Sequence, residues 1–389
     1  MRRHRALMLT LALTVSACGS SSPAMPDGGA ADGAAPDADA PGAGQAVVMT
    51  RNIYLGAALD PLVNAATLAD VLAAVPAVLA QITATDFPAR AQALAAEIAA
   101  QAPHLVGLQE VVVFALDGQE GPPPYRDYLA DLLAALADQG AHYTAVATVQ
   151  NLSFELPVPG VGAVSVRDRD VILARADVTA TPVAIDPGLC TRSLDGCTYA
   201  TAAVLNATAL GDVAIPRGFV VVDATIAGFG PLRVVSTHLE IPDLHPADPL
   251  SASVQAAQAA ELIATIPQVP NPAHAPLVVL GDMNSSPADA TVTAGATTIV
   301  PPYAQLVAVY HDTWPLAAGG APGFTCCQRE DLLNLTSMLT ARIDLVLTDW
   351  VPAAVTAALV GDQPADRTPT GLWPSDHAGV AVTLSPAAR

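Results

Sequence analysis

The sequence predicts a mixed α/β (α+β) fold built from two mixed sheets that are flanked by helices. Along residues 46–389, short β-branched runs alternate with longer alanine-rich segments, as expected for strands interspersed with helices. Neighbouring strand candidates are often joined by turns as well as by helices. A purely parallel sheet needs a long crossover after each strand, so it fits this spacing poorly. Two mixed sheets covered by helices fit it better.

The individual elements follow from these patterns. The helix candidate at 87–101 has apolar residues along one face, and Asp86 and Pro88 suit its start. With it, the helix candidates are 66–80, 87–101, 126–138 and 251–266. The strand candidates are 46–53, 104–110, 142–149, 170–174, 200–208, 218–226, 232–238, 277–281, 342–347, 353–359 and 377–384. Residues 46–389 contain no repeat of solenoid period and no linker-like stretch, so we interpret them as one domain.

Composition narrows the functional classes. Of the 389 residues, 52% are hydrophobic, which excludes disorder of the whole chain. The 16 basic residues, all arginine, face 36 acidic ones and leave a net charge of −20. This charge excludes binding of nucleic acid by a broad basic face. A phosphate-containing substrate must therefore be met locally, by a few arginines or by metal ions.

Residues 1–17 resemble a secretory signal rather than part of the fold. Arginines at the start precede an uncharged run that is far shorter than the roughly 20 apolar residues needed to span a bilayer. The run ends in Val15-Ser16-Ala17-Cys18, which resembles a bacterial lipobox and predicts a lipid on Cys18. The alternative is an ordinary cleaved signal with an incidental cysteine; the small residues around Cys18 favour lipidation. We expect an envelope lipoprotein outside the cytoplasm, periplasmic or on the outer surface, with residues 18–45 as a flexible tether.

The other four cysteines occur in two pairs. Cys190 and Cys197 bracket a short polar loop, and export would favour a disulfide between them. Cys326 and Cys327 are adjacent; they could form a vicinal bridge, stay reduced or pair elsewhere, and spacing does not decide. Neither pair has a cysteine or histidine nearby at zinc-finger spacing, so we expect no zinc site.

Polar residues at the ends of strand candidates are the most informative positions. They are Asn52, Gln109-Glu110, His238, Asp282-Met283-Asn284 and Ser375-Asp376-His377, and Asp344 lies inside an apolar strand. Strand ends that converge on one edge of a sheet commonly build an active site. Each position alone has a structural explanation, such as a strand-end cap, an Asx-turn or a partly buried imidazole. Asp344 is harder to explain in this way, because a carboxylate within an apolar strand needs a partner. Its obvious use is to orient a histidine.

Together these positions match a known family in order and local context. The chain resembles the endonuclease/exonuclease/phosphatase superfamily, which includes pancreatic deoxyribonuclease, abasic-site endonucleases, neutral sphingomyelinases and inositol-polyphosphate 5-phosphatases. The resemblance extends over residues 47–384. It is carried by the motifs Gly107-Leu108-Gln109-Glu110-Val111, Ser236-Thr237-His238-Leu239, Gly281-Asp282-Met283-Asn284 and Ser375-Asp376-His377. It implies a four-layer α/β/β/α sandwich, in agreement with the two predicted sheets.

The resemblance also implies hydrolysis of phosphoester bonds with a divalent cation, Mg²⁺ or Mn²⁺. By motif, Glu110 is the metal carboxylate, and Asn52 and Asp376 complete or adjoin its shell. Such oxygen ligands suit a hard cation. The ion would supply the positive field that lets an acidic protein handle an anionic substrate.

The remaining roles are carried over in the same way. His377, oriented by Asp344, contacts the scissile phosphate or serves in acid–base catalysis. Asp282 is the candidate general base, and Asn284 helps to position the attacking water and a phosphate oxygen. His238 is the second histidine, and its expected acidic partner is Asp168 or Asp170. The alternative explanation of Asp168 is a plain surface charge with no role at the site.

The substrate class stays open at this level. Nucleic acid, a phospholipid headgroup and a small organic phosphate all carry the required bond. Only 4% of the residues are aromatic and the arginines are scattered, which disfavours a base-stacking nuclease groove. The alternatives are a sphingomyelinase-like or phospholipase C-like headgroup hydrolase and a catalytically inactive surface protein that binds a partner.

We expect the protein to be a monomer. Two segments are longer than a compact member of the family needs. One is a helical insertion at 54–84, and the other is a loop at 323–328 that is either structural or on the substrate side.

Overall fold

The computed structural model describes residues 44–63, 65, 67–190, 196–208, 211–242, 250 and 252–387. The chain divides into the units Met1–Asp39 and Ala40–Arg389, and all described residues belong to the second. The predicted signal, Cys18 and nearly all of the predicted tether lie outside the described residues.

The first sheet contains both ends of the folded unit. Its strand β1 (Ala46–Asn52) is parallel to β2 (Leu105–Gln109) and antiparallel to β18 (Gly379–Leu384). The order is β17 (Val355–Val360), β18, β1, β2, β5 (Gly162–Arg175) and β3 (Val113–Leu116), with β4 (Tyr143–Val158) also paired to β5.

The second sheet is built around a parallel pair, β11 (Gly230–His238) and β12 (Leu277–Asp282). Its order is β15 (His311–Asp312), β16 (Asp344–Thr348), β12, β11, β10 (Gly218–Ile226) and β6 (Thr179–Pro182), with β7 (Cys197–Thr198) also paired to β10. Two small hairpins lie outside the sheets: β8 (Ala203–Thr208) with β9 (Gly211–Ile215), and β13 (Val292–Ala294) with β14 (Thr297–Ile299).

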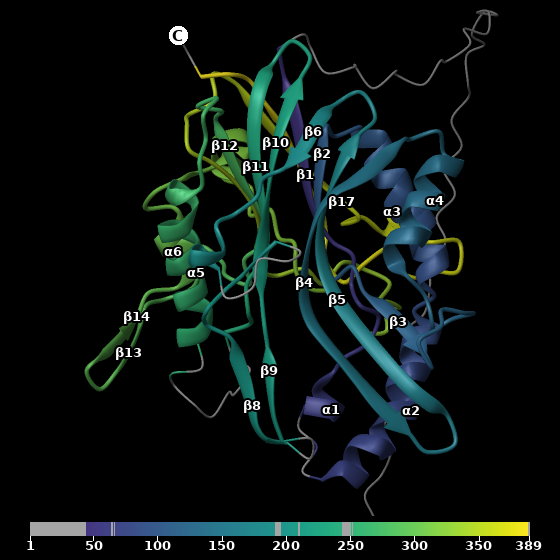
Figure 1. Cartoon of the computed structure of the whole chain (residues 1–389). Helices are drawn as coiled ribbons and strands as arrows, with labels where there is room; N and C mark the ends of the chain where they lie inside the picture. Colours follow the sequence, from purple (N-terminus) through teal and green to yellow (C-terminus); the bar gives the residue numbers. More distant parts are fainter. Residues whose placement is uncertain are drawn as a thin grey trace, which may run out of the picture. The chain divides into compact units, whose positions relative to one another are not determined.

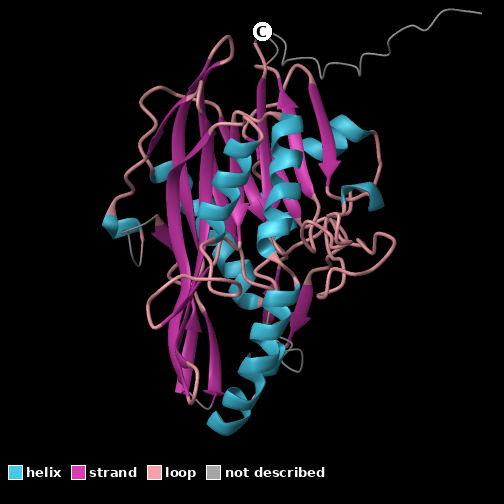
Figure 2. Ribbon diagram, turned by 90° about the vertical axis from the view of Figure 1, so that its right-hand side faces the viewer, coloured by secondary structure: helices cyan, strands magenta, loops and turns pink. Residues whose placement is uncertain are grey.

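Three buried apolar clusters separate four layers. One lies between α3 (Phe87–Gln101), α4 (Tyr128–Asp138) and the first sheet, and another between α5 (Ser253–Thr265), α6 (Pro302–Leu306) and the second sheet. The third fills the space between the two sheets. Figure 1 shows the two helix pairs on opposite sides of the strands, and Figure 2 shows helices in front of them. The predicted α/β/β/α sandwich is confirmed. The other helices are α1 (Asp60–Val63), α2 (Leu68–Ala84), α7 (Thr313–Ala318) and the 3₁₀ turns η1 (Pro187–Leu189), η2 (Ile266–Gln268) and η3 (Pro364–Asp366).

Strand alternation explains why one end of the inter-sheet space is polar. Successive side chains of a strand point to opposite faces, so every second residue faces the other sheet. On that face, apolar residues in the middle of each strand give way to polar residues at its end. The series are Val48–Thr50–Asn52 in β1, Leu105–Gly107–Gln109 in β2, Val234–Ser236–His238 in β11, Val278–Leu280–Asp282 in β12 and, running the other way, Val346–Asp344 in β16.

The insertion predicted at 54–84 consists of α1 and α2. Thr67 and Asp70 form a reciprocal capping box that starts α2. Val71 and Val75 of α2 pack on the far ends of β4 and β5. These two strands are much longer than the predicted segments 142–149 and 170–174. The outer half of β4 is apolar at every second residue, Leu152, Phe154, Leu156 and Val158, and the outer half of β5 at Val164 and Val166, so the sequence carries a strand signal that the predicted segments left out.

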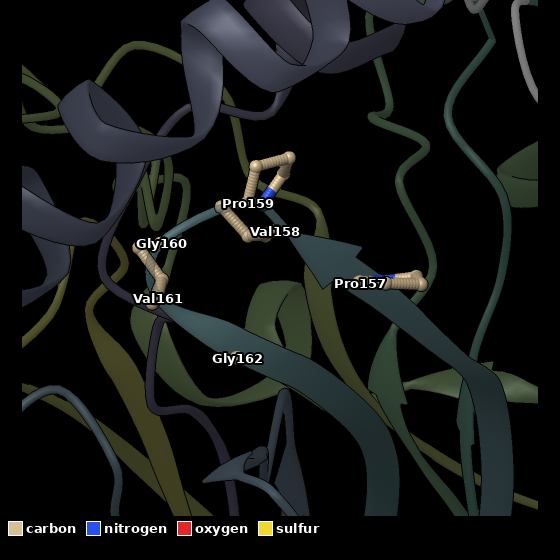
Figure 3. Close-up of a pocket in the computed structure, with 6 residues that line it drawn as sticks. All are labelled: Pro157, Val158, Pro159, Gly160, Val161 and Gly162. Atoms are coloured by element: carbon tan, nitrogen blue, oxygen red, sulfur yellow. The ribbon is translucent and has the colours of Figure 1, made fainter.

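A hollow of about 460 Å³ lies at the turn between β4 and β5 (Figure 3). It is lined by residues 157–162, none of which is titratable, so we assign it no chemistry. Among the described residues, no single helix is long and apolar enough to cross a membrane. Taken together, α2 and α3 have the length and composition, but they are bent by 44° and the apolar face of α3 is buried on the sheet.

A substitution of Gly107 tests whether the two sheets approach each other closely at this residue. A Cβ atom here would overlap Leu280 and Ser236 of the second sheet, whereas one on Gly121 would meet open space. We expect Gly107→Ala to lower the free energy of unfolding by about 1–3 kcal/mol through overpacking, and Gly121→Ala to change it by no more than about 0.5 kcal/mol. Denaturant unfolding of both variants measures this. Equal stabilities would contradict the inter-sheet contact.

Candidate active site

The polar end of the inter-sheet space brings together side chains from five strands and from the segment before β18. Asn52 of β1 donates from Nδ2 to Asp282 Oδ2 of the other sheet over 3.1 Å. His238 is the register partner of Asp282 on β11, and Asp344 is its partner on β16. All four side chains are at least 97% buried.

Two carboxylates face each other across β12 and β16, and one imidazole serves both. His377 Nδ1 lies 2.8 Å from Asp344 Oδ2 and 3.7 Å from Asp282 Oδ2. Burial lowers the pKa of His377, but Asp344, Asp376 and Asp282 outweigh it, and the pKa lies well above its usual range. Burial and Asp344 raise the pKa of Asp282 to about 6, against an opposing effect of His377. The imidazolium therefore compensates a repulsion that the strand register would otherwise impose.

The backbone around His377 is fixed by a buried arginine. Arg51 donates to the carbonyl oxygens of His377 and of Asn52, and its guanidinium pairs with Glu97 of α3 at 2.9 Å. Arg51 thus links α3 of the helix layer to β1, which carries Asn52, and to the segment before β18, which carries His377.

Glu110 follows β2 and is held by two donors. Asn52 Nδ2 donates to its Oε1 over 3.1 Å, and the Leu55 backbone N–H donates to its Oε2 over 2.7 Å. The orientation of the Asn52 amide is set by the Tyr54 N–H, which donates to Oδ1 over 3.0 Å. Glu110 adopts φ = 58°, a left-handed conformation that costs a non-glycine residue energy and is typical of functional sites.

The surroundings of Glu110 favour a bound cation. Burial, Asp376 and Asp168 raise the pKa of Glu110 to about 7, and burial also raises that of Asp376. A divalent cation relieves this mutual repulsion, and carboxylate and amide oxygens are the donors that Mg²⁺ and Mn²⁺ prefer. The donor set of Asn52, Glu110 and Asp376 therefore fits a hard cation. As placed, Asn52 turns its nitrogen toward Glu110, so its oxygen reaches a cation only after the amide turns.

The expected direct carboxylate partner of His238 is not what the structure places there. Instead, Arg217 Nη1 lies 3.2 Å from His238 Nδ1, and Asp168 Oδ2 lies behind it, 3.7 Å from the same Arg217 nitrogen. Asp168 also accepts from Asn151 over 3.3 Å, and Asp170 is fully buried behind it. Arg217 occupies the place beside His238 because its positive charge compensates the buried carboxylates of Asp168 and Asp170.

An arginine only donates, so its contact assigns the tautomer of His238. Nδ1 accepts and the proton is on Nε2. Burial, Arg217 and His377 lower the pKa of His238 well below its usual value, which keeps the ring neutral. In this tautomer Nε2 donates toward Asp282 Oδ2, 3.5 Å away. Asn284 Nδ2 lies 3.1 Å from Nε2, but both groups are then donors, so this contact is not a hydrogen bond.

Asn284 is positioned by its own backbone and by α5. Its N–H donates to Asp282 Oδ1 over 2.9 Å, and its Nδ2 donates to the Leu239 carbonyl over 2.9 Å. Gln255 of α5 donates to the carbonyls of Met283 and Asn284 over 3.2 and 2.6 Å.

Both cysteine pairs of the folded unit form disulfides. Cys190 is joined to Cys197, and Cys326 is joined to Cys327. Cys327 is exposed and lies near His377, with 3.9 Å between Sγ and Nε2.

Sequence reasoning missed Arg217, Arg51 and Thr325, the last of which accepts from the backbone N–H groups of Ile343 and Asp344. Arg217 directly precedes β10, whose first residues pair with the end of β11. Inspection of polar residues before strands, as well as after them, would have found it.

Comparison with known proteins agrees with this geometry. The profile described as "Endonuclease/Exonuclease/phosphatase family" matches residues 52–377. The chain is similar in structure to an endonuclease/exonuclease/phosphatase from Beutenbergia cavernae DSM 12333, with 20% identity and a TM-score of 0.50, covering 88% of this chain and 72% of that one. This similarity shows the fold. No curated protein sequence matches the chain significantly.

Two further solved structures are more distant. A family protein from Leptotrichia buccalis C-1013-b has 12% identity and a TM-score of 0.48, covering 88% of this chain and 100% of that one. The human Nocturnin catalytic domain has 16% identity and a TM-score of 0.45, covering 88% of this chain and 93% of that one.

The raised pKa of Glu110 makes the stability of the metal-free protein fall as pH rises from acidic to neutral values. The unfolded chain loses this proton near pH 4.5 and the folded chain near pH 7, so this group's contribution to the free energy of unfolding falls as pH rises through that window. We expect Glu110→Gln to flatten the loss of stability between pH 4.5 and about pH 7, measured in EDTA by denaturant unfolding. His238, with its lowered pKa, contributes the opposite sign below pH 6.5 in both proteins.

Glu155→Gln, which removes an exposed carboxylate of β4, is the matched control and should keep the wild-type slope. A Glu110→Gln protein with an unchanged slope would contradict the account of the acidic cluster.

Proposed function

Because the chain belongs to the endonuclease/exonuclease/phosphatase family, we propose that it hydrolyses phosphoester bonds with a divalent cation, Mg²⁺ or Mn²⁺. The observation that supports this most is the meeting of Asn52, Glu110, Asp282, Asp344 and His377 at one end of the inter-sheet space. When bound by Glu110 with Asn52 and Asp376, the cation would supply the positive charge that offsets the phosphate and its leaving oxygen.

The chain's own residues would move and hold the protons. Asp282, with a pKa of about 6, is mostly ionised at neutral pH, and its Oδ2 accepts a proton from the water that attacks phosphorus. The imidazolium of His377, held by Asp344 at Nδ1, donates from Nε2 to a phosphoryl oxygen. Neutral His238, through Nε2, and the Asn284 backbone N–H both contact the Asp282 carboxylate and hold it in place. Asn284 would also help to position the attacking water and a phosphate oxygen. Arg217 acts through His238, with Asp168 behind it, as a positioning residue.

The first test is the purified protein with Mg²⁺ against DNA, RNA, sphingomyelin, phosphoinositides and bis-p-nitrophenyl phosphate. Cleavage of a member of this panel supports the proposal. Binding of Mg²⁺ without hydrolysis of any of them would instead favour the inactive binding protein.

Substitution of the two central groups should remove activity but not the fold. We expect Asp282→Ala and His377→Ala to lower kcat by about 10²–10⁴-fold, because each removes a proton-transfer or charge-stabilising group. Glu155→Gln should keep wild-type turnover, and circular dichroism checks the folds. EDTA should abolish wild-type activity and added Mg²⁺ or Mn²⁺ should restore it. Near-normal turnover of either alanine variant would refute the assignment.

A second candidate substrate class is favoured by the loop that follows Cys327. Its side chains Leu333, Leu335 and Met338 are 51%, 75% and 48% exposed. The loop is tied to the site, because the Gln328 N–H donates to the Asp376 carbonyl over 2.7 Å. Apolar groups beside a phosphoester site suit a lipid headgroup in a membrane. A lipid on Cys18, with residues 18–45 as tether, would hold the enzyme at such a surface in the bacterial envelope.

The lipid candidate predicts a selective effect of Leu335→Asn. It should lower hydrolysis of a phospholipid in vesicles roughly severalfold, since less apolar surface enters the membrane, but leave bis-p-nitrophenyl phosphate hydrolysis unchanged. Leu316→Asn, which changes a 49% exposed leucine of α7, is the control. Equal rates of vesicle phospholipid hydrolysis by the Leu335→Asn and Leu316→Asn variants would contradict this candidate.

A further inference from the structure

The loop at 323–328, singled out in the sequence, brings two cysteines to the catalytic histidine. The backbone of Cys326 pairs with Ala341 on one side and with His377 on the other. Three backbone hydrogen bonds hold the neighbouring residues: Thr340 to the Cys326 carbonyl at 2.6 Å, Ala378 to the Thr325 carbonyl at 2.8 Å and Gln328 to the Asp376 carbonyl at 2.7 Å. The backbone of the cysteine pair is thus hydrogen-bonded to the segment that carries His377.

The sulfur atoms lie beside the free nitrogen of His377. Cys327 Sγ is 3.9 Å from His377 Nε2, and the two sulfurs and this nitrogen all lie within 4.8 Å of one another. Nδ1 of the same ring is bonded to Asp344. Cys326 is 9% exposed, and Cys327 is exposed, so reagents reach the pair from solvent.

Opening of the disulfide would convert this trio into metal ligands. An external dithiol or phosphine supplies two electrons, the Cys326–Cys327 S–S bond breaks and two thiols form. A dithiol gives up its two hydrogens and closes to its own disulfide. With a phosphine, one water supplies the two thiol hydrogens and the oxygen of the phosphine oxide. A thiophilic cation then displaces the two thiol protons. Tetrahedral Zn–S and Zn–N bonds place sulfur and nitrogen ligands roughly 3.5–4 Å apart. The 3.9 Å between Cys327 Sγ and His377 Nε2 matches this, and the two sulfurs would move apart once their bond is broken. A carboxylate on the second nitrogen of a ligating imidazole, here Asp344, is also what such sites use.

We propose that the reduced Cys326–Cys327 pair and His377 Nε2 form a binding site for a thiophilic divalent cation, Zn²⁺ or Cd²⁺, distinct from the carboxylate site of Glu110. The vicinal disulfide closes this site and leaves Nε2 free. Its occupation takes Nε2 away from the phosphate and inhibits hydrolysis; this consequence, unlike the binding, rests on the proposed function. The sequence expectation of no zinc site considered only local spacing, whereas the fold supplies His377 from 50 residues away.

Cd²⁺ binding tests the site without any substrate. The full chain, reduced with a phosphine that is then removed, is titrated with Cd²⁺ while the thiolate-to-metal charge-transfer absorbance is followed. We expect one equivalent to bind to the reduced protein, no such band in the oxidised protein, and at least 100-fold weaker binding to reduced Cys326→Ser/Cys327→Ser. His377→Ala should weaken binding at least tenfold but keep the band.

The control is Cys190→Ser/Cys197→Ser, which removes the other disulfide and should bind Cd²⁺ as the wild type does. Equal affinity and band intensity in the wild type and in Cys326→Ser/Cys327→Ser would overturn the proposal. If that double variant fails to fold, Cys327→Ser, at the exposed position, takes its place, with the same outcome overturning the proposal.

The inhibition arm separates this proposal from the proposed function. Micromolar Zn²⁺ should lower Mg²⁺-dependent hydrolysis at least tenfold in the reduced protein, relative to its own zinc-free rate, and much less in the oxidised protein or in the double cysteine variant. Equal inhibition in all three would place the inhibitory zinc elsewhere and overturn the inhibitory role. Cd²⁺ binding by the pair, with no ester hydrolysed under any condition, would leave the metal site standing and sink the proposed function instead. Hydrolysis without cysteine-dependent Cd²⁺ binding would do the reverse.

Discussion

The site depends on one imidazole that lies between two carboxylates. Strand register places Asp282 and Asp344 opposite each other on β12 and β16, where like charges repel. His377 enters from the segment before β18 and contacts both. Because β18 belongs to the first sheet and the carboxylates to the second, this interaction also joins the two sheets at the end where their apolar packing stops.

The other residues of the site form two groups of opposite charge around this imidazole. On one side, Glu110 and Asp376 accumulate negative charge that a hard cation would compensate. On the other, Arg217 brings positive charge that keeps His238 neutral. The two histidines therefore differ in charge although both are buried near Asp282, and this difference gives them different tasks at a phosphate. Cys326 and Cys327 add a third chemistry next to the same ring.

The sequence predicts the fold class and the principal site residues because both follow from local patterns. Apolar strand-like runs that end in polar residues pointed to Asn52, Glu110, His238 and Asp282, and strand pairing brings these ends together. Relations across large sequence separations were not predictable in this way. Arg217 precedes its strand and takes the place expected for a carboxylate beside His238, and the approach of Cys327 to His377 exists only in the folded chain. The lengths of β4 and β5 were underestimated although Leu152, Phe154, Leu156 and Val158 recur at every second position of β4, so this part of the fold was predictable from the sequence.

The most direct measurement of the central interaction is a double-mutant cycle on unfolding. The free energies of unfolding of the wild type, Asp344→Asn, His377→Asn and the double variant give the coupling between the two side chains, whatever the substrate. A buried, hydrogen-bonded ion pair predicts a favourable coupling of about 1–3 kcal/mol. Effects that add within about 0.5 kcal/mol would mean that the pair is not coupled in the folded protein, and the account of the site would fail.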